Sequence, residues 1–174
     1  TGAKPLNPDN CQFVAEAYTL RFIPMREDLS RVEVLGDPEY PPRKAVEDIA
    51  PGLALVIDAR GEPGAGVIGD ILAARMHERG VAAVVSDGPV RDGAIVAAGG
   101  LPVFCAGYAA PASLHVHFGA DLQCPIACGG VAVIPGDILV GDGDGVVVIP
   151  AAMAEEVARD GAEQERLEGF LKSR

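Results

Sequence analysis

The chain has 174 residues, 49% of them hydrophobic, and a formal net charge of −11 at pH 7. This length and apolar content suffice for one core, so a single domain over residues 1–174 is expected. Its three lysines, Lys4, Lys44 and Lys172, form no basic stripe, which argues against direct nucleic-acid binding. No apolar run approaches the roughly 18 residues of a membrane span, and no basic-then-apolar leader is present. We therefore expect a cytoplasmic protein that does not contact a membrane.

The first half of the chain predicts alternating strands and helices. A strand is expected over 18–23, a proline-rich irregular excursion over 25–43, and a short helix over 45–49. Short runs rich in Val, Ile and Ala then predict strands at 53–58, 81–86 and 102–106, with a helix over 71–79 that Gly80 can close. This alternation is typical of an α/β fold.

The second half predicts closely spaced strands and a terminal helix. Strands are expected at 131–134, 138–141 and 145–149, joined by tight glycine- and aspartate-rich turns, so this half should be β-rich. Pro150 suits the first turn of a C-terminal helix, which could be interrupted at Asp160-Gly161. Met153, Val157, Leu167, Phe170 and Leu171 could form its apolar stripe.

The four cysteines, Cys11, Cys105, Cys124 and Cys128, are expected to be reduced, buried thiols. A chain with this much core does not need disulfides for stability. No second Cys/His pair stands at zinc-finger spacing, which argues against a structural zinc site.

The most informative segment is the glycine-rich stretch 61–70, followed after the next strand by Arg91 and Asp92. Glycines before a helix leave backbone N–H groups free to bind a carboxylate or phosphate. In an open α/β sheet both loops would lie on the ligand-binding edge. One site could then combine an anion cradle, a cation in Arg91, and carboxylates in Asp70 and Asp92 for a metal.

Other interpretations of these residues remain open. The segment 64–69 matches the dinucleotide-binding expression G-x-G-x-x-G, but no acidic residue that suits a ribose follows. Arg91 and Asp92 could simply form a surface ion pair or cap a helix. His115 and His117 would share one strand face, the geometry of a metal-binding pair, whereas Asp142 and Asp144 are expected to be turn residues.

Several motifs together resemble the RraA-like family. They are Gly69-Asp-Ile-Leu-Ala73, the run 80–92 that ends in Val-Arg-Asp, Pro125-Ile-Ala-Cys-Gly-Gly130, and the run 142–150. The spacing of Asp70, twenty residues, then Arg91-Asp92 is their most specific element. That family includes 4-hydroxy-4-methyl-2-oxoglutarate aldolases with oxaloacetate decarboxylase side activity, and regulators of ribonuclease E. The resemblance implies an α/β/α sandwich of the swivelling β/β/α type with a β-rich C-terminal half and a terminal helix.

The resemblance also implies roles for individual residues. Asp92 would hold Mg²⁺ or Mn²⁺, Arg91 would contact the substrate and the developing enolate, and Asp70 would position metal-bound water. The amides of Ile71 and Leu72, after Gly69, would receive the pyruvate carboxylate. These roles agree with the preference of Mg²⁺ for oxygen ligands and of carboxylates for helix N-termini. The implied reaction is metal-assisted carbon–carbon cleavage of a pyruvate-derived 2-oxo acid through a pyruvate enolate.

The alternative function is a non-catalytic regulator that binds ribonuclease E through an acidic surface. A methyltransferase, an older label within the family, lacks a convincing adenosylmethionine motif here. The resemblance further implies a homotrimer or hexamer, with Glu165 or Glu168 of a neighbouring copy reaching the site. It implies a helical segment before the position of Thr1, and the long excursion 24–43 is expected to cover or reshape the site.

Overall fold

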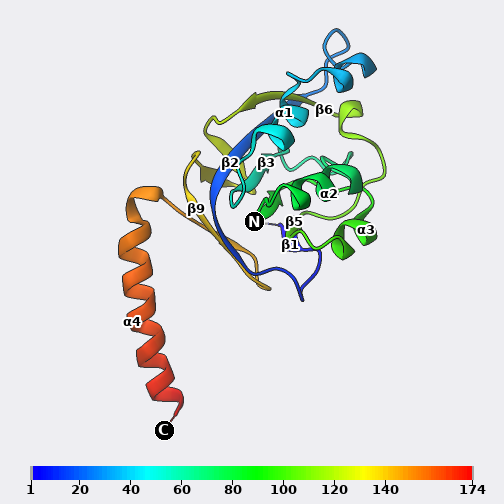
Figure 1. The fold of residues 1–174 in the computed structure, drawn as a ribbon. Helices are drawn as coiled ribbons and strands as arrows, with labels where there is room; N and C mark the ends of the chain where they lie inside the picture. The colour runs from blue at the N-terminus through cyan, green and yellow to red at the C-terminus, as the bar shows by residue number, and fades with distance from the viewer. Residues whose placement is uncertain (1, 174) are drawn as a thin grey trace.

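The computed structural model describes residues 2–173, and its centre is a curled sheet (Figure 1). Four parallel strands form the middle of this sheet: β2 (Phe13–Pro24), β3 (Ala54–Asp58), β4 (Ala83–Ser86) and β5 (Val103–Cys105). The strand order is β1-β5-β4-β3-β2-β9-β10, and β6 also pairs with β2. The antiparallel members are β1 (Lys4–Pro5), β6 (His117–Leu122), β9 (Ile138–Gly141) and β10 (Val146–Ile149).

Helices cover one face of the sheet and β structure covers the other. Leu55 and Ile57 of β3 face a core shared with helices α1 (Pro41–Asp48), α2 (Asp70–Glu78) and α3 (Gly93–Ala98). Val56 points to the opposite core, because successive strand side chains alternate between faces. That second core includes residues of β9 and of the small hairpin β7 (Ile126–Cys128) and β8 (Val131–Val133). The predicted mixed α/β fold of the β/β/α type is confirmed.

All seven predicted strands are present, although several boundaries differ. The strand predicted at 18–23 is the central part of the twelve-residue β2. Its first residues pair with β9, and residues 17–21 pair with β3. Strands β1, β6 and β7 had not been predicted, because they are short or carry glycine and polar residues that weaken the strand signal.

The excursion 25–43 is largely irregular, as predicted, but it contains a 3-10 helix, η1 (Val32–Gly36). Helix α1 begins at Pro41 rather than at residue 45. Proline suits a first helical position because its missing N–H would have no partner there. The excursion therefore ends in a helix that packs on the sheet beside α2.

The C-terminal helix differs most from expectation. A 3-10 turn, η3 (Ala151–Met153), leads into α4 (Ala154–Lys172), which runs without a break through Asp160-Gly161. The predicted interruption is wrong: one exposed glycine lowers helix stability by only about 1 kcal/mol, too little to end a helix of this length. No residue of α4 is buried, and the helix projects away from the sheet (Figure 1). No helix within residues 2–173 has the length and apolarity to cross a membrane.

The cysteine prediction is confirmed except for the burial of Cys124. All four cysteines are free; Cys11, Cys105 and Cys128 are buried, and Cys124 is half-buried. Burial raises the pKa of the Cys128 thiol to about 12. The reactive thiolate form is therefore scarce at neutral pH.

We expect Cys128 to resist alkylation by iodoacetamide at pH 8 in the folded protein, while half-buried Cys124 reacts measurably faster. Both cysteines lie in one tryptic peptide, residues 92–159, so tandem mass spectrometry of fragments that separate Cys124 from Cys128 measures the two rates over a time course. Urea-unfolded protein provides the control in which the two react alike. Equal rates in the folded state would contradict the burial of Cys128.

Candidate active site

The candidate site lies where two neighbouring parallel strands end. β3 ends at Asp58 and β4 at Ser86, and the parallel pairing of Ile57 with Ser86 places both carboxyl ends at one edge. The glycine-rich loop follows β3, and the loop bearing Arg91 follows β4. The expectation that both loops lie at one edge of the sheet is confirmed. In open α/β sheets this carboxyl edge is where ligands commonly bind.

Two backbone hydrogen bonds join these loops directly. The N–H of Val67 donates to the carbonyl of Pro89 (3.0 Å), and the N–H of Arg91 donates to the carbonyl of Ile68 (2.8 Å). They place the start of α2 beside Arg91 and Asp92. The alignment of the loops is therefore set by main-chain contacts, which do not depend on charge.

Gly66 makes this close approach possible. A Cβ atom at this position would lie 2.5 Å from Cγ and 2.6 Å from the backbone nitrogen of Arg91. These distances are far inside van der Waals contact, so any larger residue would push the two loops apart. Sequence reasoning noted this glycine but missed its role, because the position of Arg91 against it is a tertiary contact.

The result is one hollow of about 260 Å³, called here the site hollow. It is lined by all of the residues predicted from the sequence to form the site: Gly69, Asp70, Ile71, Leu72, Arg91 and Asp92. Asp70 and Arg91 are half-buried and Asp92 is exposed. The structure thus brings the candidate residues together, while the role of each stays a prediction.

Arg91 is free to bind a ligand. Within residues 2–173 its side chain has no hydrogen-bond or ion-pair partner, and its Nε is buried. The alternative of an Arg91–Asp92 surface ion pair is therefore wrong for this structure. A buried guanidinium nitrogen without a partner is costly, which makes an oxyanion at this position favourable.

Asp92 adopts a left-handed backbone conformation, with φ of +53°, directly before α3. Its carboxylate makes no side-chain cap to α3, and Oδ2 lies against Gly69, where a Cβ would approach it to 2.8 Å. Left-handed conformations are uncommon outside glycine and are tolerated best by Asp and Asn. The strained turn directs the carboxylate across the strand edge toward the start of α2.

The start of α2 provides a smaller anion cradle than expected. The Oδ1 atom of Asp70 accepts the N–H of Ile71 (2.8 Å), so this amide already has a partner. The N–H of Ala73 donates to the carbonyl of Gly69 (3.0 Å) and makes the first hydrogen bond of the helix. The N–H of Leu72, one residue earlier, has no acceptor among the described residues. A ligand carboxylate can bind Leu72 directly and reaches the Ile71 amide once the Asp70 side chain turns away.

The donor set fits a magnesium-type ion. The two carboxylates of the site hollow are hard oxygen ligands, and neither is consumed by an ion pair. No group of three or more His, Cys, Asp or Glu residues that could hold a metal gathers anywhere in residues 2–173, the site hollow included. Mg²⁺ characteristically binds through one or two carboxylates and keeps several waters, so Asp92 and Asp70 are the residues that could hold it here.

The histidine pair considered from the sequence does not form. His115 belongs to a 3-10 helix, η2 (Ser113–His115), whereas His117 begins β6 and is fully buried. His117 packs on Phe22, with ring centroids 5.2 Å apart, and its Nδ1 lies 3.1 Å from Nη2 of Arg60. Burial and the Arg60 charge lower the pKa of His117 and favour its neutral form.

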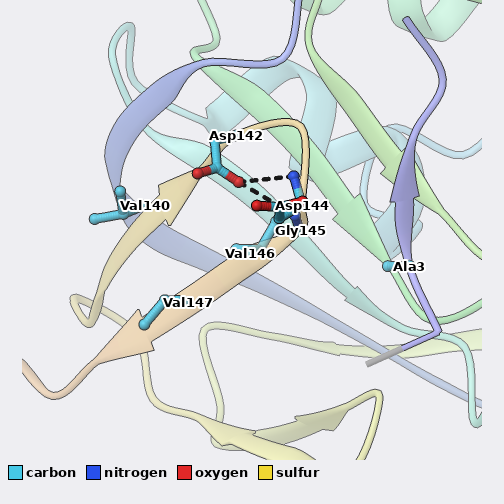
Figure 2. A pocket seen from close by; sticks show the side chains of 7 residues that line it. All are labelled: Ala3, Val140, Asp142, Asp144, Gly145, Val146 and Val147. Atoms are coloured by element: carbon cyan, nitrogen blue, oxygen red, sulfur yellow. Dashed lines mark hydrogen bonds between the residues drawn. The ribbon is translucent and has the colours of Figure 1, made fainter. Parts of the chain in front are cut away.

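The two aspartates of the β9–β10 turn are turn residues, as predicted. Oδ1 of Asp142 accepts the N–H groups of Asp144 (2.9 Å) and Gly145 (3.3 Å), as Figure 2 shows. An open hollow of about 330 Å³ lies beside this turn and Ala3. The Asp142 carboxylate is therefore engaged in stabilising the turn itself.

The fold and the candidate site define a mixed α/β protein whose site hollow lies at the carboxyl edge of parallel strands. The family model described as "RraA-like: Aldolase/RraA" matches residues 1–148, and the chain belongs to this family.

Curated and solved relatives agree with this assignment. A protein from Halalkalibacterium halodurans named "Putative 4-hydroxy-4-methyl-2-oxoglutarate aldolase" is 37% identical over 154 residues, covering 88% of this chain and 67% of the relative. The chain spans about two thirds or less of the curated relatives it matches. RraAS2 of Streptomyces coelicolor, described as an unusual member of the RNase ES inhibitor RraA protein family, is 34% identical with a TM-score of 0.88. That match covers 100% of this chain and 83% of RraAS2.

A more distant solved relative is the RNA-processing inhibitor RraA of Thermus thermophilus. It is 26% identical with a TM-score of 0.65, and the match covers 86% of this chain and 82% of that protein. These two solved relatives are described as inhibitors of RNA processing, while the Halalkalibacterium halodurans relative is named as an aldolase.

We expect Gly66→Ala to lower the free energy of unfolding by about 1–3 kcal/mol, because the added methyl group overpacks the contact with Arg91. Urea denaturation followed by circular dichroism measures the change. Gly64→Ala is the matched control, because its nearest neighbour is the flexible end of Glu62. Equal stability of the two variants would contradict the role assigned to Gly66.

Proposed function

We propose that this protein is a divalent-metal-dependent lyase that cleaves a carbon–carbon bond of a pyruvate-derived 2-oxo acid. The reaction would be a retro-aldol cleavage of the 4-hydroxy-4-methyl-2-oxoglutarate type, together with decarboxylation of oxaloacetate. The observation that carries the proposal is the site hollow, where an unpaired arginine, two available carboxylates and a free helix amide converge. The name of the curated relative supports the same class of reaction.

Each group of the site hollow has a role in this chemistry. The N–H of Leu72 binds the substrate carboxylate at the positive end of α2. The Arg91 guanidinium donates to the C2 oxygen and stabilises the negative charge that develops there as the bond breaks. Asp70 orients a water molecule that takes the proton from the C4 hydroxyl. In oxaloacetate, CO₂ leaves instead and no such proton transfer is needed.

Asp92 would hold the Mg²⁺ or Mn²⁺ ion. Asp70 lines the same hollow and could supply a second carboxylate oxygen. When bound, this ion supplies Lewis-acid stabilisation of the enolate. Lysine-based Schiff-base chemistry is not part of the proposal, because no lysine lines the site hollow.

We expect Asp92→Ala to lower pyruvate release by at least about 100-fold, because it removes the proposed metal ligand. Arg91→Ala should cost about 100- to 1000-fold through lost stabilisation of the oxyanion. Release from oxaloacetate and from 4-hydroxy-4-methyl-2-oxoglutarate is measured with lactate dehydrogenase, in Mg²⁺ or EDTA. Asp144→Ala, in the exposed β9–β10 turn, is the matched control and should keep full activity. No metal-dependent turnover of either compound by the wild-type protein would reject both as substrates.

A second candidate function is a non-catalytic regulator that binds ribonuclease E. The descriptions of the solved relatives support it, and the net charge of −11 suits contact with a basic RNA-binding segment. Binding that is lost at moderate salt and is unaffected by Asp92→Ala would favour this function over the lyase.

We also propose that the chain assembles as a homotrimer, or as a hexamer of two trimers. Exposed apolar residues on α4 support this: Met153 precedes the helix, and Val157, Leu167 and Leu171 follow at spacings that keep them on one face. A solitary helix gains most of its stability from packing such a face. Docked on a neighbouring copy, α4 would carry Glu165 or Glu168 toward that copy's site.

We expect the double variant Leu167→Glu/Leu171→Glu to dissociate the assembly, because charges replace the apolar contact. Light scattering coupled to size-exclusion chromatography measures the mass, and wild type is expected at three or six times the mass of one chain. Ala162→Glu, on the opposite side of α4, should leave the mass unchanged. A wild-type monomer, or an intact double variant, would contradict the proposal.

A further inference from the structure

A second cavity, of about 450 Å³, lies beside the site hollow and is called here the apolar cavity. The excursion, α1 and α2 form its walls. It is lined by Leu35, Tyr40, Pro42, Arg43, Val46, Glu47, Val67, Ile71, Leu72, Arg75 and Ser113. Its volume lies within the range of ordinary small-molecule sites.

The inner wall of this cavity is apolar and rigid. Tyr40, Val46 and Val67 are only 4%, 2% and 4% exposed. The Tyr40 hydroxyl accepts the N–H of Gly119 (3.2 Å), so the residue offers its ring to the cavity. A charged group placed against this wall would lose its hydration without gaining a partner, which is unfavourable.

The charged residues stand at the exposed rim, and two of the three form an ion pair. Arg75 binds the Glu47 carboxylate through Nε (3.2 Å) and Nη2 (2.9 Å). Arg43 donates from Nη1 to the carbonyl of Gly36 (2.7 Å). The Arg75–Glu47 pair offers no uncompensated charge to a ligand carboxylate, whereas Arg43 keeps its positive charge at the outer rim, away from the buried inner wall.

The two cavities are adjacent. Ile71 and Leu72 line both of them, and the Leu72 amide is the proposed contact for the substrate carboxylate. A ligand held at this amide can therefore extend over the side chains of Ile71 and Leu72 into the apolar cavity.

We propose that the apolar cavity is the subsite for the part of the substrate beyond its pyruvyl group. It favours an uncharged, apolar substituent, so oxaloacetate and 4-hydroxy-4-methyl-2-oxoglutarate, which carry a second carboxylate there, should bind more weakly than a 2-oxo acid with an alkyl chain. This inference rests on the proposed function. It makes Leu35 of the excursion, which is 46% exposed at the cavity, a residue that determines specificity.

Binding of unreactive 2-oxo acids tests the proposal without relying on turnover. Isothermal titration calorimetry in Mg²⁺ compares the binding of pyruvate, 2-oxoglutarate and 2-oxooctanoate to the 174-residue chain. We expect 2-oxooctanoate to bind at least about tenfold more tightly than 2-oxoglutarate, because its alkyl chain is removed from water. Tighter or equal binding of 2-oxoglutarate, or no binding of 2-oxooctanoate, would overturn the proposal.

Two tryptophan variants test whether the affinity for 2-oxooctanoate depends on the apolar cavity. Leu35→Trp should fill the apolar cavity and reduce the affinity for 2-oxooctanoate to that for pyruvate, without changing pyruvate binding. Val32→Trp is the matched control, because Val32 lies on the same 3-10 helix, is 74% exposed and does not line the cavity. If Leu35→Trp binds 2-oxooctanoate like wild type, or if it changes only the mass of the assembly, the cavity is not a substrate subsite.

The failure of this inference is distinguishable from failure of the lyase proposal. Metal-dependent pyruvate release from oxaloacetate together with no preference for 2-oxooctanoate would reject the apolar subsite and keep the lyase. A preference for 2-oxooctanoate that Leu35→Trp abolishes, in a protein that releases no pyruvate from any 4-hydroxy-2-oxo acid supplied, would support the cavity as a binding site and reject the lyase.

Discussion

The close backbone contact between the loops after β3 and β4 is the constraint on which the candidate site depends. Two main-chain hydrogen bonds, Val67 to Pro89 and Arg91 to Ile68, hold these loops together, and Gly66 leaves the space they need. Because the two strands are parallel and adjacent, both loops start from the same edge of the sheet. The buried sheet thus supplies a rigid base, and the functional side chains extend from its rim.

The charged side chains of the site hollow form no ion pairs with one another. Arg91 lies in the same hollow as two carboxylates without an ion pair, whereas Arg75 on the nearby surface is paired with Glu47. An unpaired buried guanidinium nitrogen costs stability in the free protein. Such a cost is commonly found at sites where a ligand later supplies the missing partner. The site hollow and the apolar cavity therefore differ in chemistry although they share Ile71 and Leu72.

Sequence reasoning identified the fold class and the residues that gather at the site, but it failed where signals were weak or contacts were distant. The runs before Asp58 and Ser86 are long, apolar and β-branched, so their strands were predictable. Strand β6 begins with a buried histidine and contains glycine and aspartate, and it is stabilised by pairing with β2 rather than by its own composition. The break expected at Asp160-Gly161 did not occur, because a local glycine preference is weaker than the cooperativity of a long helix.

The sequence by itself determined the chemical inventory of the site and its order along the chain: a glycine-rich loop, a helix start with Asp70, and Arg91-Asp92 after the next strand. Tertiary structure alone decided which of these groups are partnered. The Ile71 amide is occupied by Asp70, the Arg91 side chain is free, and His117 is buried against Phe22 rather than paired with His115. The excursion likewise became the wall of an apolar cavity only by packing next to α2. The physical reason is that local patterns report the backbone preferences of nearby residues, whereas partnership and cavity shape depend on distances between segments that folding brings together.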